Sequence, residues 1–559
     1  MGSILLPLIV STLLFLLITT YLYCRSKYSY WSKRGIRGPK PSPVFGNLLS
    51  LLLNDRWKLE RDLTRDYGSV FGVYNAFRPR LVIGDPEIIR QISIKDFDAF
   101  PNHEQSQFLN SYQKEFLFFL QDHKWKRTRA LMSLTFTSSK ITRMYKLLDT
   151  CADDLIDVFD EARAPPMDPR KRYKSARPVQ EQNVVNLKDV FSLYTMDAIA
   201  TCCYGLKLKR EVGSTSLRSA ASRNEFVRMA SKLLRFRWAR FLVAASLPRF
   251  LTSRLDYKLV PEDDLAELAN VAEKLIKSRR SHMGLKRFDD YLQLLVEASS
   301  DDKLEHSEVD LHENHHADVT PESLKADQER LLSETDAKGS KGKIALTDDE
   351  ILANTLFLLA VGLETTASAL TACVYALAFH QQVQERLFDE VSKIAEWNEK
   401  KTCLKLDYKA LTSCQYLDAT ISETLRYAAP LVRMDRVSSR DYYIEKYNLH
   451  LPKGSKIFLG LYAAMNNKDY WHQPEQFNPD RFMAGQREQI VAGSYCPFGL
   501  GPRHCIGMRF SLTESKLALA KLLMYFRFEP APNTNFPPEA RGVGVSVVSR
   551  PFVRVLRRE

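Results

Sequence analysis

The chain has 559 residues, of which 45% are hydrophobic, so it is long and apolar enough to bury a large core. Its formal net charge of +13 is a mild basic excess, compatible with nucleic acid, an anionic membrane surface or an acidic protein partner. Nine cysteines, an odd number without a C-x-x-C framework, argue against a disulfide-stapled secreted domain and favour reduced thiols facing the cytosol.

Residues 1–24 are predicted to form an N-terminal membrane anchor. Residues 4–23 carry no charge and would span about 30 Å as a helix, the thickness of the hydrocarbon layer. A basic, proline-rich hinge follows over residues 25–47, and by the positive-inside rule it remains cytosolic. A cleaved signal peptide is the alternative, but the basic n-region and the small-residue cleavage site are missing. A membrane anchor also argues against nucleic acid as a partner.

The first half of residues 48–559 predicts mixed structure. Alternation over 69–82 indicates a β-hairpin, and an aromatic, irregular stretch covers 100–119. Trp125 and Arg129 are one helical turn apart and share a face, although a solvated basic helix has the same pattern. Residues 226–251 mix apolar and basic side chains, as an interfacial helix pair or a buried helix with a basic face would.

Two polar stretches are interpreted as insertions. The basic segment 162–178 is expected to be a solvated loop, and 299–344 a disordered surface segment. The second contains four histidines, a weak candidate metal site, at positions His306, His312, His315 and His316.

The longest apolar run lies at 351–379, after a capping box formed by Thr347 and Glu350. As a helix it would extend about 43 Å, and its only charge is Glu364. A charge at the centre of a bilayer is costly, so a buried central helix is favoured over a second transmembrane span. Glu364 and Thr365 form an acid–alcohol pair that can relay protons through ordered water. Thr365 alone could instead bond back to the preceding turn.

The C-terminal part contains an E-x-x-R pair, Glu423 and Arg426, whose side chains share one helix face. Strand–turn–strand structure is predicted at 449–461, and a hairpin tip at 542–548.

The stretch Phe498-Gly499-Leu500-Gly501-Pro502-Arg503-His504-Cys505-Ile506-Gly507 predicts a tight glycine loop that ends in a cysteine before a helix. Loop amides and the helix N-terminus can stabilise a thiolate at Cys505, and such a thiolate is an effective axial ligand for haem iron. Cys496 with His504 could suggest zinc, but a tetrahedral site needs further ligands that are not evident.

These motifs together resemble the cytochrome P-450 superfamily over roughly residues 38–559, apart from the two insertions. L-M-S-L-T-F-T-S-S-K at 131–140 and R-M-D-R-V at 433–437 are similar to the animal microsomal clan of thromboxane synthase and the main liver drug-oxidising subfamily. The resemblance implies a mainly α fold with small β-sheets, in which residues 48–559 form one haem-thiolate domain.

The resemblance also assigns residues. It implies propionate or haem contacts from Trp125, Arg129, Arg436, Arg503 and Phe498, and a buried structural triad of Glu423, Arg426 and Arg481. It places eight residues in a substrate pocket, although core packing is as good an explanation for each phenylalanine: Phe108, Phe116, Phe118, Phe119, Pro430, Leu431, Val432 and Arg433. Gly362 would make room beside the haem for dioxygen, and Val361 stands where the family usually has Ala or Gly, which narrows the oxygen groove.

The implied activity is that of an unspecific-type monooxygenase with haem b, which inserts one oxygen atom of O₂ into lipophilic xenobiotics, sterols or fatty acids. Electrons would come from NADPH through NADPH–cytochrome P-450 reductase, docked on the basic face around Cys505 and 124–127, with cytochrome b5 as a candidate second donor. We expect an endoplasmic reticulum protein with a single span and a cytosolic catalytic domain. A haem-thiolate isomerase of endoperoxides and a non-catalytic haem- or sterol-binding membrane protein remain alternatives.

Overall fold

The computed structural model describes residues 2–163, 183–208, 215–222, 224–234, 257–282, 288–297, 346–398, 404–542 and 544–558, together with residues 240, 243 and 254. The protein is mainly α-helical with small sheets, as the sequence predicts. Most of the predicted insertion 162–178, all of 299–344 and most of 226–251 lie outside the described residues.

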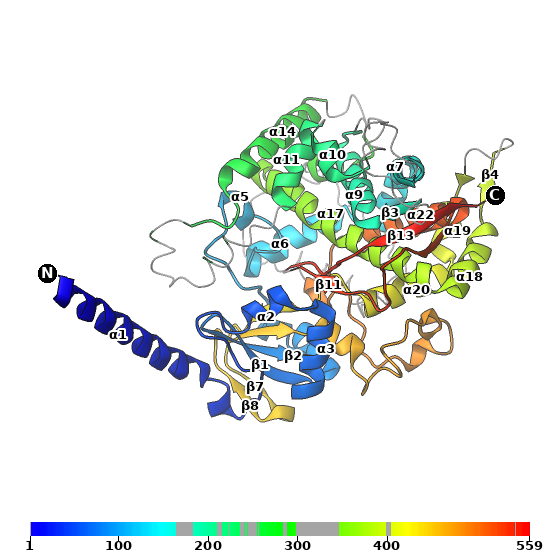
Figure 1. The fold of residues 1–559 in the computed structure, drawn as a ribbon. Coiled ribbons are helices and arrows are strands. Elements are labelled where there is room, and N and C mark those ends of the chain that lie inside the picture. The colour runs from blue at the N-terminus through cyan, green and yellow to red at the C-terminus, as the bar shows by residue number, and fades with distance from the viewer. Residues whose placement is uncertain are drawn as a thin grey trace.

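The N-terminal helix α1 (Gly2–Tyr28) projects from a lobe of small sheets (Figure 1). Tyr28 at its end packs edge-on against Tyr74, with ring centroids 5.0 Å apart. The following Trp31 donates its indole N–H to the carbonyl of Val73 at 3.2 Å. A Cβ on Gly72 would lie 2.3 Å from the Trp31 ring, so only glycine lets this strand lie against the hinge.

The lobe contains the predicted hairpin, β1 (Val70–Asn75) and β2 (Arg78–Ile83), paired from Val70 with Ile83 to Asn75 with Arg78. A four-stranded sheet has the order β1-β2-β9-β6, with β9 (Lys456–Leu459) parallel to β2 and β6 (Met434–Val437) antiparallel to β9. The predicted strand–turn–strand at 449–461 forms, but β8 (Leu449–Leu451) pairs with β7 (Tyr442–Ile444) in a separate sheet.

The remaining strands form three small sheets. β10 (Phe526–Pro530), β13 (Phe552–Arg557) and β3 (Val184–Asn186) make a three-stranded sheet. The two-stranded sheets are β4 (Glu396–Trp397) with β5 (Leu404–Lys405), and β11 (Ala540–Arg541) with β12 (Val547–Val548). Between β11 and β12 lies the predicted hairpin tip, where the N–H of Ser546 donates to the carbonyl of Pro430 at 2.7 Å.

Helix α17 (Asp348–Phe379) runs through the middle of the helical lobe (Figure 1). It packs along α9 (Leu187–Tyr204) and also contacts α14 (Glu262–Ser281), α20 (Gln415–Tyr427) and α22 (Met508–Tyr525). The predicted capping box is present, because the Thr347 hydroxyl accepts from the N–H of Glu350 and the Glu350 carboxylate from the N–H of Thr347.

Among the described helices, α17 has the length and hydropathy for a membrane span, and 67% of its most apolar window is buried inside the protein. The burial agrees with a central core helix, the alternative that the sequence favours.

The other helices surround these elements. They are α2 (Leu48–Leu53), α3 (Arg56–Tyr67), α4 (Pro86–Arg90), α5 (Ser111–Lys114), α6 (Asp122–Ser133), α7 (Ser138–Arg163), α10 (Leu217–Ala221), α11 (Glu225–Leu234), α15 (Tyr291–Glu297), α18 (Gln381–Ser392), α19 (Tyr408–Ser413) and α21 (Leu461–Asn466). Short turns of helix are η1 (Ser32–Arg34), η2 (Gln91–Lys95), η3 (Phe97–Ala99), η6 (Glu445–Tyr447), η7 (Pro479–Phe482), η8 (Arg487–Gln489) and η9 (Gly501–Arg503).

Candidate active site

The cysteine loop is held in one shape by its backbone. Gly499 and Gly501 have φ of 76° and 69°, the left-handed region that favours glycine. A Cβ on Gly501 would lie 1.9 Å from the carbonyl oxygen of Ser93, so the loop lies directly against η2. The N–H of Cys505 donates to the carbonyl of Phe498 at 2.9 Å and closes the loop just before α22.

Cys505 is the only exposed cysteine among those that the structure describes. Burial nevertheless raises the pKa of its thiol, while the backbone N–H of Gly507 and the Arg129 guanidinium act in the opposite direction. The side chain is thus accessible, while the surrounding protein still desolvates its sulfur. The amide and the guanidinium are the groups that favour the thiolate over the thiol.

Cys496 and His504, the pair that could suggest zinc, have few of the surroundings that a zinc site needs. Cys496 is fully buried, and burial raises the pKa of its thiol to about 12. The ring Nδ1 of His504 lies 2.8 Å from the carbonyl of Gly501. Within the described ranges, no group of three or more metal-ligating side chains gathers anywhere. The histidines of segment 299–344 fall outside those ranges.

Three buried arginines form a cationic cluster near this loop, and one buried histidine lies against them: Arg129, Arg436, Arg503 and His103. The Arg503 guanidinium stacks 3.9 Å from the Trp125 ring centroid and donates to the carbonyls of Pro101 and Leu120, each at 2.9 Å. Burial, together with repulsion from Arg436 and Arg129, lowers the pKa of Arg503 to about 8.

Burial also lowers the pKa of the other two guanidinium groups. Desolvation lowers the pKa of Arg129 to about 10, and attraction to Cys505 opposes this shift. Desolvation likewise lowers the pKa of Arg436 to about 10, and attraction to Asp435 opposes it. Arg436 Nη1 donates to the carbonyl of Asp435 at 2.8 Å and lies 3.2 Å from Nδ1 of His103. Burial and the neighbouring Arg436 lower the pKa of His103 to about 4, so the imidazole is neutral at pH 7.

This cluster fits the two propionates of a haem. The buried Nε of Arg436 and Nη1 of Arg503 make no hydrogen bond within the described structure. Uncompensated buried cations are costly, so the cluster requires carboxylates as partners. His103 was not a candidate in the sequence, because a lone histidine in an irregular segment carries no motif. Its contact with Arg436 and its packing against Phe118, with ring centroids 4.0 Å apart, place it here.

Helix α17 is open on one side at its centre. Val361 is 39% exposed, although most of the helix around it is buried. The Thr365 hydroxyl donates to the Val361 carbonyl at 2.8 Å, which is the back-bonding alternative raised by the sequence. The next residue, Thr366, lies 3.1 Å from the Ser511 hydroxyl on α22, so the helix centre is tied to the helix that follows Cys505.

Gly362 lies where α17 packs against α9. A Cβ at this position would lie 2.8 Å from Cδ1 of Ile199 on α9. The missing side chain therefore allows α9 and α17 to pack closely. That it also makes room beside the haem stays a prediction.

Glu364 of α17 forms an ion pair with a residue of α9. Its carboxylate accepts from the Lys188 ammonium of α9 at 2.6 Å, and both side chains are partly buried. Burial lowers the pKa of Lys188, and Glu364 opposes that shift. The acid predicted for proton relay is therefore held in an ion pair that the sequence did not reveal.

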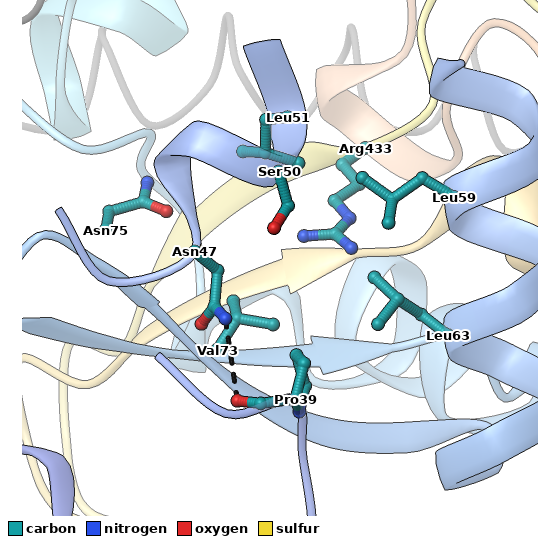
Figure 2. Close-up of a pocket in the computed structure, with 9 residues that line it drawn as sticks. All are labelled: Pro39, Asn47, Ser50, Leu51, Leu59, Leu63, Val73, Asn75 and Arg433. Carbon is teal, nitrogen blue, oxygen red and sulfur yellow. Dashed lines mark hydrogen bonds between the residues drawn. The ribbon is translucent and has the colours of Figure 1, made fainter. Parts of the chain in front are cut away.

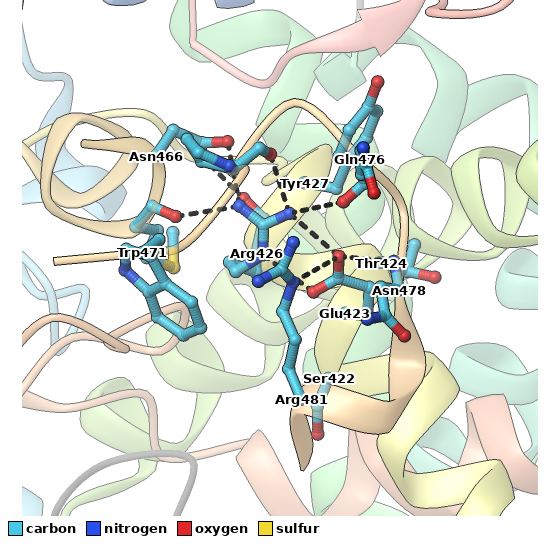
Figure 3. Close-up of polar contacts among 12 residues, drawn as sticks. Ser422, Glu423, Thr424, Arg426, Tyr427, Asn466, Trp471, Gln476, Asn478 and Arg481 are labelled. Atoms are coloured by element: carbon cyan, nitrogen blue, oxygen red, sulfur yellow. Dashed lines mark hydrogen bonds and ion pairs between the residues drawn. The ribbon is translucent and has the colours of Figure 1, made fainter. Parts of the chain in front are cut away.

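Glu423, Arg426 and Arg481 come together as the sequence expects (Figure 3). Arg426 donates to both oxygens of Glu423, at 2.7 and 2.8 Å, and Nε of Arg481 lies 3.5 Å from the same carboxylate. Arg426 also donates to the carbonyls of Met465 at 3.0 Å and Pro474 at 2.9 Å. These contacts fix α20 to the chain that leads into the cysteine loop.

The pocket candidates are distributed over several elements. Phe116 packs against Phe357 of α17, Phe108 against Tyr257, and Phe119 against Phe118. Val432 is buried, Leu431 is partly exposed, and both follow Pro430, which contacts the β11–β12 tip. Arg433 is placed elsewhere: its Nε donates to Glu60 of α3 at 2.9 Å.

An exposed thiol in a rigid glycine loop, beside a buried cation cluster suited to two carboxylates, defines a haem-thiolate protein. Residues 36–554 match the sequence family described as Cytochrome P450. Cytochrome P450 3A5 of Homo sapiens is 30% identical over 542 residues, covering 96% of this chain and 94% of the relative. Cytochrome P450 3A11 of Mus musculus is 29% identical over 544 residues, with coverage of 96% and 94%. The chain belongs to the cytochrome P450 family, whose cofactor is haem b with electrons delivered from NADPH through a reductase.

Proposed function

We propose that this protein is an NADPH-dependent monooxygenase that oxidises lipophilic substrates, with Cys505 as the axial ligand of its haem. The observation that carries the proposal is the exposed thiol of Cys505 in its closed loop, next to the buried guanidinium cluster. When bound, haem b with a thiolate ligand supplies reductive activation of dioxygen. The residues of the chain hold the cofactor, exclude water and deliver protons.

Proton delivery is assigned to Glu364 with Thr365. Because Glu364 holds Lys188 at 2.6 Å, its carboxylate can relay a proton only after this pair opens. The Thr365 hydroxyl uses its hydrogen on the Val361 carbonyl, so its oxygen is left as an acceptor that can orient a water molecule.

Cofactor retention is assigned to the cationic cluster. Trp125, Arg129, Arg436 and Arg503 would contact the propionates, with His103 as an additional donor or acceptor, and Phe498 would pack against the ring. Phe108, Phe116, Phe119, Leu431 and Val432 remain substrate-pocket candidates, and the β11–β12 tip beside Pro430 supports a pocket near the last two.

Attachment to the endoplasmic reticulum membrane through α1, with residues 48–559 in the cytosol, is part of the proposal. Large apolar side chains of α1 are exposed, among them Leu14 at 56% and Phe15 at 67%, which favours a lipid environment. Protease treatment of intact microsomes tests this topology: the catalytic domain is expected to be digested.

For the redox partner we propose a flavoprotein reductase, with cytochrome b5 as a candidate second donor. The basic stretch 124–127 is a weaker docking surface than its sequence indicates. Lys124 contacts Glu115, Trp125 is buried, and Arg127 bonds Glu350 at 2.7 Å at the start of α17. Neutralised cations contribute less to electrostatic steering.

The test uses the full-length protein in membranes with reductase and NADPH. The reduced carbon monoxide complex is expected to show the far-shifted Soret band of thiolate coordination, and Cys505→Ala is expected to lose it. Oxygen consumption and product formation from a lipophilic compound should both require NADPH. Turnover of an endoperoxide without NADPH would instead identify an isomerase, and binding without any product would identify a carrier.

A further inference from the structure

A second buried cation cluster lies away from the haem loop, between α3 and the residue before β6. Glu60 is completely buried and faces two arginines, with Arg433 Nε at 2.9 Å and Arg56 Nη2 at 3.5 Å from its carboxylate oxygens. Both arginine side chains are less than one-tenth exposed. Burial, together with repulsion from Arg433, lowers the pKa of Arg56 to about 10, against the pull of Glu60.

The cluster is short of one negative charge. Two guanidinium groups share one carboxylate, and the buried Nη1 of Arg56 and Nη2 of Arg433 make no hydrogen bond within the described structure. A buried charge that is not balanced destabilises a protein, and one further anion would balance this cluster. The required charge of −1 matches a monovalent anion better than a phosphate group, which carries more charge.

Arg433 lines a cavity of about 40 Å³, enough for a few water molecules or one small polar headgroup. Figure 2 shows its guanidinium and the Ser50 hydroxyl directed into the same space. Asn47 is already engaged, because its amide donates to Lys40 at 3.3 Å and its carbonyl accepts from Tyr74 at 2.9 Å. Cationic and hydroxyl donors are thus present in the cavity.

The rest of the wall is mainly apolar: Leu51, Leu59, Leu63 and Val73 contribute to it. Leu51 and Leu59 are only partly buried, and the nearby Leu53 is 80% exposed, so the apolar wall continues towards the surface at α2. An apolar wall disfavours a strongly hydrated inorganic ion and suits an anion attached to a hydrocarbon chain. The unbalanced positive charge and the apolar wall together favour a carboxylate as the ligand, with its hydrocarbon chain running along α2 towards the surface.

We propose that Arg433 and Ser50, beside the buried Arg56–Glu60 pair, form a binding site for a monocarboxylate with an apolar chain, separate from the haem. The carboxylate completes the charge of the Arg56–Glu60–Arg433 cluster and ties α3 to the start of β6. The ligand could come from free short-chain acids or from fatty acids of the membrane, and the two sources share this chemistry.

The experiment uses full-length holoenzyme saturated with an iron-coordinating azole, so that acids cannot act at the haem. Butyrate, octanoate and oleate are titrated by calorimetry and thermal unfolding, with sodium chloride at equal ionic strength as reference. One saturable site and a rise in unfolding temperature are expected with the acids alone. An affinity that increases with chain length identifies membrane fatty acids, and equal affinities identify free short acids.

Arg433→Met leaves Arg56 and Glu60 as a balanced pair, so the variant should fold and bind the acids at least about thirtyfold more weakly. Leu51→Trp narrows the cavity without changing its charge and should weaken octanoate binding as well. Arg61→Met is the matched control, because Arg61 lies on α3 but donates to Tyr462 at 2.8 Å and does not line the cavity. Absence of a saturable site, equal stabilisation by chloride, or undiminished binding in both Arg433→Met and Leu51→Trp would overturn the proposal.

Discussion

Replacing Gly501 with alanine tests how strictly the cysteine loop depends on its backbone. At φ 69°, any side chain occupies a strained conformation that costs about 1–2 kcal/mol. The added Cβ would also meet the Ser93 carbonyl at 1.9 Å, and since that atom belongs to η2, the backbone itself has to move. Overpacking of this kind costs roughly 1–3 kcal/mol.

The two contributions sum to roughly 2–5 kcal/mol and fall on the segment that presents Cys505. If about 3 kcal/mol of this is lost only in the cofactor-bound state, haem affinity decreases on the order of 100-fold. Gly507→Ala is the matched control in the same loop, because its φ is −88° and an added Cβ meets nothing within 4 Å.

Haem content per protein and the carbon monoxide spectrum of both variants provide the assay, after purification under identical conditions. Gly501→Ala should emerge largely without haem or with an altered thiolate band, whereas Gly507→Ala should match the wild type. Equal haem content and equal spectra in the two variants would refute the argument that the contact with η2 determines the loop.

Three further predictions follow from single contacts. Glu423→Gln should lower the free energy of unfolding by about 3–5 kcal/mol, because it leaves the buried Arg426 without its charge partner. Denaturant unfolding measures this free energy, and a loss under about 1 kcal/mol would contradict the prediction. Lys188→Met should raise the share of NADPH electrons that reach product by up to roughly fivefold, because it frees the Glu364 carboxylate. An unchanged share would show that the ion pair does not limit proton delivery by Glu364. Burial raises the pKa of Asp197 from an ordinary 3.8 to about 6, so the folded state loses stability as pH rises between these values. Asp197→Asn should therefore raise the unfolding temperature more at pH 7.5 than at pH 5. Equal increases at the two pH values would contradict the raised pKa.

The parts that could be predicted from sequence are those whose physics is local. The capping box at Thr347, the back-bond of Thr365 and the pair Glu423–Arg426 each join residues three or four apart, and the structure contains all three. The glycine loop before Cys505 belongs to the same group, because positive φ is a property of single residues.

Contacts set by packing could not be foreseen in this way. Lys188 and Glu364 are 176 positions apart, and they meet only because α9 lies along α17. The same packing explains why the Cβ direction of Gly362 points to Ile199, which no motif encodes. His103 likewise joins the cation cluster through a segment without regular structure.

The two cation clusters are related through β6. Arg433 directly precedes this strand and Arg436 lies within it, three positions later. Because successive side chains of a strand alternate between its faces, residues three apart point to opposite sides of the sheet. Arg436 accordingly joins His103 near the cysteine loop, and Arg433 joins Glu60 on α3. Each side has more buried guanidinium charge than nearby carboxylate. On the Arg436 side, the propionates of the haem site that we propose would balance the excess. The same charge balance on the Arg433 side calls for an anion that the cofactor cannot supply.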